Sequence, residues 1–204
     1  MSTLRMMGQV LTHPIDFFQE LRDPGRIRWY RAPLLVLLAF AAKMASIMVT
    51  GFAFQTREAY EISSLFELVW IVVPWATWCV ANWGVSSILD GEGRFGEVVH
   101  GSAFALVPYI LFAVPVTLLT NWLSLDESGL YEFLMTLVLG WCAWLLLLMV
   151  RIVHDFETGK MLFIVLLTLI GMGVIWFIFI LLFGFMSQFV YFVLDLIKEI
   201  RLRG

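Results

Sequence analysis

The sequence predicts an all-α membrane protein: a bundle of about five transmembrane helices with a short amphipathic helix at each end of the chain. Hydrophobic residues make up 61% of the 204 residues and charged residues only 14%, whereas a soluble domain carries about 25% charged residues. The apolar residues gather in five long runs separated by short polar segments. A soluble fold of this length could not cover so much apolar surface, so lipid must form part of the solvent.

Each apolar run is long enough to cross a membrane as a helix. The runs are roughly 22 residues long, and about 20 helical residues cross the ~30 Å of hydrocarbon. Strands are excluded because the runs are continuously apolar, and only helices or closed barrels satisfy the backbone in lipid. The predicted spans are residues 32–54, 66–89, 98–119, 131–153 and 161–183.

The N-terminal segment, residues 1–31, is predicted to contain an amphipathic helix over residues 13–22 on the cytoplasmic surface. Pro14 suits a first helical turn, and the Asp-Pro-Gly sequence at 23–25 ends the helix. The predicted apolar face consists of Ile15, Phe18 and Leu21.

The C-terminal segment, residues 184–204, is predicted to be a second amphipathic helix, lying in the membrane interface. Polar residues recur there at three- to four-residue spacing, unlike in the fifth run. The polar positions are Gln188, Tyr191, Asp195 and Lys198, and the opposite face holds Phe185, Phe189, Phe192, Leu196 and Ile200. An alternative divides residues 161–197 into two short spans and returns the tail to the cytoplasm.

Lysine and arginine indicate the orientation, because cytoplasmic loops are enriched in them. The other side of the predicted bundle has only Arg57 before the C-terminal tail. We therefore expect a cytoplasmic N-terminus and, with five spans, an external C-terminus. The residues on the N-terminal side are Arg5, Arg22, Arg26, Arg28, Arg31, Arg94, Arg151 and Lys160.

Composition argues against several classes of function. The net charge is −3 without a basic block, so nucleic acid is not an expected partner. Cys79 and Cys142 lie inside apolar runs, where a thiol behaves as a small hydrophobe. His100, His154 and Asp155 near helix ends could ligate a metal, but no HExxH spacing is present. We expect no catalytic residue, metal or cofactor.

Lys43 lies near the middle of the first span. A lysine there costs about 2.5–3.5 kcal/mol on insertion scales. It could serve an ion, a proton or a lipid headgroup. It could equally be structural, bonded to carbonyls or resting on Trp75 or Trp78 of the neighbouring span.

A set of polar and helix-breaking residues is predicted to form a contact and conformational site rather than a reactive one. Most lie at the cytoplasmic ends of spans, where a bundle brings helix ends together. A proline within the third span gives either a hinge or a fixed bend. The residues are Asn82, Asp90, Gly91, Glu92, Gly93, Arg94, Pro108, Tyr109, His154 and Asp155.

Several short motifs occur in a characteristic order. They are His13-Pro14-Ile15-Asp16-Phe17-Phe18, Ala81-Asn82-Trp83, Asp90-Gly91-Glu92-Gly93-Arg94-Phe95, the stretch from Gly101 to Tyr109, His154-Asp155, and Gly171-Met172-Gly173. Together they resemble the Yip family of integral membrane proteins, named for interaction with Ypt/Rab GTPases, and specifically its bacterial branch. The chain departs from the pattern at His100, where the family has a tyrosine.

The resemblance implies a five-helix bundle without enzymatic activity, with the N-terminus inside and the C-terminus outside. Eukaryotic members are membrane partners of prenylated GTPases in vesicle traffic, an activity that we do not expect here. Bacterial members are suggested to be accessory partners of ABC transporters.

Three functional hypotheses follow for a protein of the bacterial plasma membrane. The first is a scaffold or accessory subunit that binds another integral membrane protein, with ABC transporter subunits as candidates. The second is a small transporter, channel or lipid-handling protein that uses Lys43 and Asn82. The third is an intramembrane enzyme that uses His100, His154 and Asp155. The sequence favours the first and leaves the oligomeric state open.

Overall fold

The computed structural model describes residues 3–23, 25 and 27–203, and these are helices joined by short turns and loops. Pro24 and Arg26, and the side chains of Leu196 and Ile200, enter the predictions above but lie outside the described residues. Five helical stretches are long and apolar enough to cross a membrane, which confirms the predicted fold class. They are α3 (Arg31–Val49), α4 (Ser64–Ile88), α5 (Phe95–Phe104) together with α6 (Val107–Leu118), α7 (Ser128–Val153) and α8 (Thr158–Arg203).

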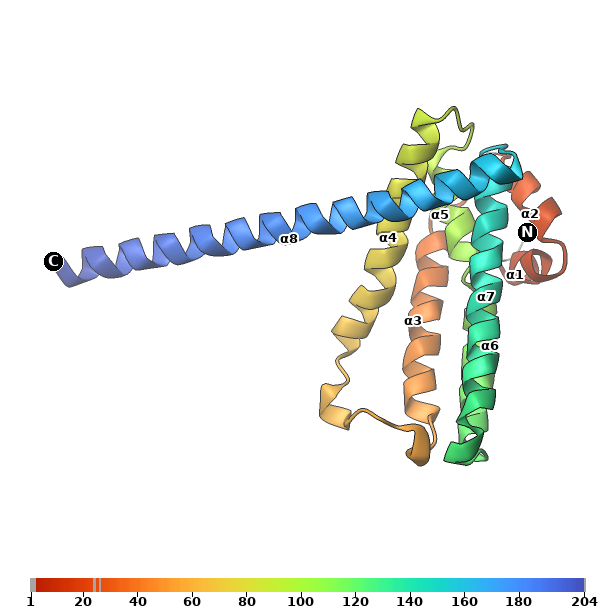
Figure 1. Cartoon of the computed structure of the whole chain (residues 1–204), viewed down its shortest axis with the longest axis horizontal. Helices are drawn as coiled ribbons and strands as arrows, with labels where there is room; N and C mark the ends of the chain where they lie inside the picture. Colours follow the sequence, from red (N-terminus) through yellow and green to blue (C-terminus); the bar gives the residue numbers. More distant parts are fainter. Residues whose placement is uncertain (1–2, 24, 26, 204) are drawn as a thin grey trace.

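Helices α3, α4, α6 and α7 run side by side, whereas α8 crosses the bundle near one end (Figure 1). We call this the turn end, because it carries the turns Asp90–Arg94 and His154–Glu157. The loop end carries the connections Thr50–Ser63 and Asn121–Glu127. The hydrophobic core cluster lies in the turn half and includes Phe18, Phe104 and Leu145.

The predicted N-terminal amphipathic helix is α2 (Pro14–Leu21), which begins at Pro14 as expected. It packs against α7 and α5, with the ring of Phe17 centred 4.8 Å from that of Phe104. The predicted face was partly wrong, because Phe17 is buried and Ile15 is exposed. A preceding helix, α1 (Thr3–Thr12), was not predicted. It buries two methionines and Val10.

The third predicted span, residues 98–119, is broken at the proline for which the sequence predicts a hinge or a fixed bend. Helix α5 ends at Phe104 and α6 begins at Val107. Pro108 explains the break, because it has no N–H to donate to the carbonyl of Phe104. The helix restarts with proline in its first turn, where Ile110 N donates to Leu106 O at 3.0 Å. Pro108 is buried.

Helix α8 is a single helix of 46 residues, about 69 Å long at 1.5 Å per residue. The predicted boundary between a span and a separate helix at residue 184 is therefore not a helix end. The alternative of two short spans is wrong, because the described part of α8 contains no turn. Helix α8 crosses the bundle instead of running alongside α7 (Figure 1).

Candidate functional site

Helices α4 and α7 end in the same hydrogen-bonded motif at the turn end. Gly91 N donates to Ser86 O at 2.8 Å, and Phe156 N donates to Arg151 O at 2.9 Å. These are the long-range bonds of a Schellman cap, which requires a left-handed residue just after the helix. Asp90 (φ 58°) and Asp155 (φ 55°) occupy these positions. The two aspartates thus set the direction of the chain as it leaves each helix.

The backbone role of Asp155 predicts how it tolerates substitution. We expect Asp155→Gly to keep or raise the free energy of unfolding, because glycine adopts positive φ without strain. Asp155→Val should lower it by about 1–2 kcal/mol, because a β-branched residue is disfavoured there. Thermal unfolding of the purified protein checks both variants. An equal loss in the two would show that the carboxylate, rather than the conformation, matters.

His154 is buried at the start of the α7–α8 turn and packs against the α4–α5 turn. Only 1% of its surface is exposed, and its ring stacks on Phe156 with centroids 5.5 Å apart. Within the described residues neither ring nitrogen has a hydrogen-bond partner. Burial therefore lowers the pKa of His154 to about 4, and the imidazole is neutral at neutral pH.

The two glycines of the α4–α5 turn allow the backbone of this turn to lie close to His154. A methyl group on Gly93 would lie 2.6 Å from His154 Nδ1 and 2.8 Å from Val153 Cγ1. A methyl group on Gly91 would lie 2.8 Å from Phe156 Cζ. These distances are shorter than van der Waals contact, so the predicted turn and the predicted His154-Asp155 pair form one packed unit.

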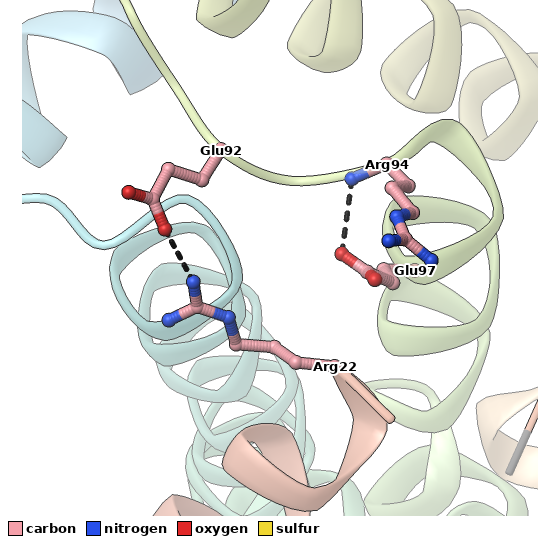
Figure 2. A network of polar contacts seen from close by, with 4 residues as sticks. All are labelled: Arg22, Glu92, Arg94 and Glu97. Carbon is pink, nitrogen blue, oxygen red and sulfur yellow. Dashed lines mark hydrogen bonds and ion pairs between the residues drawn. The ribbon is translucent and has the colours of Figure 1, made fainter. Parts of the chain in front are cut away.

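Charged residues tie α2 to this unit (Figure 2). Arg22 Nη2 lies 2.5 Å from Glu92 Oε2, and both side chains are partly exposed, so the pair contributes at most about 1 kcal/mol. Across the turn, the backbone N–H of Arg94 donates to the buried carboxylate of Glu97 at 2.9 Å. The polar groups of the turn thus cap the start of α5 and connect α2 to the turn.

The remaining predicted site residues lie elsewhere. Asn82 is buried on α4 and donates to Thr168 Oγ1 of α8 at 3.2 Å. His100 is held on α5, with Nδ1 2.7 Å from Gly96 O and Nε2 2.9 Å from Arg28 O. Pro108 makes the break in the third span, and Tyr109 beside it faces the loop half of the bundle.

A cavity of about 620 Å³ opens in the loop half, lined by α3, α4, α6, α7 and the loop after α3. Lys43 and Tyr109 both line it. The proposed resting place of Lys43 on Trp75 or Trp78 is not found among the described ring contacts, and Trp75 Nε1 donates to Ser102 Oγ at 3.0 Å. Lys43 instead faces the cavity.

Sequence reasoning missed Glu67 in this cavity. Glu67 is 5% exposed in the first turn of α4 and lies 2.7 Å from Arg57 Nη1. It lies at the start of the second predicted span, residues 66–89. The folded loop after α3 carries Arg57 back onto it. The signal available was an acid inside the apolar limit of a predicted span.

Fold and site together define a multi-pass α-helical membrane protein. Its turns pack tightly against each other at one end, and a cavity opens in the other half. A family model described as the Yip1 domain matches residues 8–181. The chain therefore belongs to the Yip1-domain family, as the motifs predicted. No curated protein and no solved structure matches it. The match ends before the last part of α8.

Proposed function

We propose that this protein is a non-enzymatic scaffold or accessory subunit that binds another integral membrane protein, with ABC transporter subunits as candidates. It would act in the bacterial plasma membrane with its turn end in the cytoplasm. The observation that carries the proposal is the exposed, apolar distal part of α8.

Helix α8 is the least buried of the five candidate spans. Only 11% of its most apolar stretch is buried, against 44% in α5 and α6. Its first part packs on α4, where Trp176 Nε1 donates to Thr77 Oγ1 at 3.2 Å. Beyond Trp176 the large apolar side chains that the structure describes are exposed, except for the half-buried Val193, and Phe183 is exposed to 75%. Residues 177–183 of this helix are apolar on all sides. Such a stretch belongs in lipid or against another helix.

Two residues of distal α8 favour another transmembrane helix as its binding partner. Gly184 has open space around it, and Gln188, one turn further, is exposed without a hydrogen-bond partner among the described residues. Small residues let membrane helices approach closely, and an amide is satisfied there by a polar group of the neighbouring helix. A transmembrane helix that carries such a group fits this face.

The proposal predicts the effect of blocking this face. We expect the double variant Gly184→Leu with Gln188→Leu to lose a membrane partner that copurifies stoichiometrically with the wild type. Recovery should fall at least tenfold, because the leucines remove close approach and the hydrogen bond. Affinity purification from native membranes in mild detergent, followed by mass spectrometry, measures it.

The control is Gly140→Leu on α7, which also has open space around it and should keep the partner. Partner recovery that is equal in all three proteins would contradict the role of α8. Wild type recovered alone, or only with a second copy of itself, would overturn the accessory role.

A further inference from the structure

We propose that the cavity of the loop half binds an anionic lipid, with its acidic headgroup between Lys43 and Arg57 and its chain along Phe66, Trp70, Met135 and Leu139. This site is separate from the proposed docking face on α8. It assigns a ligand class to a cavity that the packing of the turn end does not use.

The cavity is divided between a polar rim and an apolar wall. Gln55, Thr56 and Arg57 lie on the rim, in the loop after α3, and Tyr109 lies deeper, at the start of α6. The wall consists mainly of aliphatic and aromatic side chains from α4 and α7. A mostly apolar cleft with a few converging polar groups is typical of a small-molecule site. A ligand with one polar head and one apolar tail matches this division.

The charges of the cavity favour an anion. Arg57 is paired with Glu67 at 2.7 Å, which leaves Lys43 as an additional cation facing the same space. Lys43 has no hydrogen bond or ion pair within the described part of the chain. The three groups therefore sum to one positive charge. A lysine in the hydrocarbon region costs about 2.5–3.5 kcal/mol, and an acidic headgroup beside Nζ would offset this cost.

A second polar group on the same face of α3 lacks a partner. Ser46 lies one turn after Lys43, is buried, and its hydroxyl makes no hydrogen bond to a described residue. Tyr109 and Tyr131 place two further hydroxyl-bearing side chains in the lining. A carboxylate or phosphate has several acceptor oxygens and can take hydrogen bonds from an ammonium and hydroxyls together.

The location selects a lipid over a water-soluble anion. The walls belong to four of the candidate membrane spans, namely α3, α4, α7 and the α6 part of the third span. The cavity therefore lies beside the acyl chains of the bilayer. Exposed apolar side chains such as Phe66 and Trp70 border it on α4. A soluble anion would leave this wall without a partner, whereas an acyl chain covers it.

The test uses the full-length protein in phosphatidylcholine nanodiscs and native mass spectrometry. The probes are phosphatidylglycerol and oleate, with oleyl alcohol as the uncharged counterpart of oleate. We expect the wild type to retain an acidic lipid, and Lys43→Met to bind it at least tenfold more weakly because the unpaired cation is gone. Lys160→Met, at the opposite end of the bundle, should bind as the wild type does.

Each result either identifies the kind of lipid that supplies the acid group or rejects the lipid site. Retention of oleate alone indicates a fatty acid, retention of phosphatidylglycerol alone indicates a phospholipid, and retention of both indicates that the acid group is sufficient. Equal binding of oleate and oleyl alcohol, or equal binding of the acidic lipid by the wild type and Lys43→Met, would overturn the proposal.

Glu67→Gln supplies an independent check that does not depend on Lys43. The substitution releases Arg57 and raises the net charge of the cavity, so the acidic lipid should bind as tightly as in the wild type or more tightly. Weaker binding in this variant, in protein that melts like the wild type, would contradict the charge argument. The α8 double variant should bind lipid normally, so the lipid site and the docking face can fail separately.

Discussion

Gly93→Ala is expected to lower the free energy of unfolding by about 2–3 kcal/mol, the upper range for overpacking a filled core. The new methyl group would lie 2.6 Å from His154 Nδ1 and 2.7 Å from its Cε1. The ring cannot move away easily, because it is buried and stacked on Phe156. Val153 closes the other side and is fully buried. Thermal unfolding followed by tryptophan fluorescence measures the loss, about 2–4 °C per kcal/mol for a chain of this size.

Gly140→Ala is the matched control, because Gly140 lies within α7 with open space around it. Alanine in a helix interior is more stable than glycine by about 0.5–1 kcal/mol, so this variant should melt slightly higher than the wild type. If Gly93→Ala instead melts within about 1 °C of the wild type, the two turns are not the packed unit described here.

Acidification is expected to lower the free energy of unfolding through protonation of His154. Burial lowers the pKa of His154 to about 4, from an ordinary value of 6.5. The unfolded chain therefore binds a proton at a higher pH than the folded chain does. The free energy of unfolding should fall as the pH drops through this interval. Between neutral pH and about pH 4.5 the loss should be about 2–3 kcal/mol.

His154→Leu isolates this contribution. Leucine fills a similar volume, carries no proton and removes two buried nitrogens that lack partners, so it should cost little at neutral pH. All other ionisable residues are the same in both proteins, so their contribution cancels in the difference. The melting temperature of the variant should fall less on acidification. Parallel pH curves for the two proteins would show that His154 is protonated equally in the folded and unfolded states.

The two ends of the bundle differ in how their polar groups are used. At the turn end, the aspartates cap helices, Glu97 bonds a backbone N–H and His154 fills space between glycines. Polar atoms without a described partner occur at both ends. The ring nitrogens of His154 are packed against Phe156 and the glycines of the turn, whereas Lys43 and the hydroxyl of Ser46 line the cavity of the loop half. We therefore place ligand binding at the loop end and a structural role at the turn end.

Prediction of the site was uneven for identifiable reasons. The turn and the His154-Asp155 pair were expected to meet, because short connections bring helix ends together, and the structure joins them. Lys43 was recognised as expensive in lipid, but its surroundings were not. Trp75 and Trp78 were predicted as neighbours of Lys43 because they lie at a similar depth in the membrane. Which side chains face each other also depends on how each helix is rotated about its axis. Glu67 was missed because its burial requires Arg57 from a folded loop.

Hydrophobic runs and short motifs are local properties of the chain, so the lipid environment, the number of long apolar helices and the family could be predicted from the amino-acid sequence. The docking of α2 through Phe17, the course of α8 across the bundle and the cavity around Lys43 became visible only in the folded structure. These features depend on which faces of separate helices meet. Continuously apolar helices show little difference between their faces, so their sequences do not specify how they are rotated against one another.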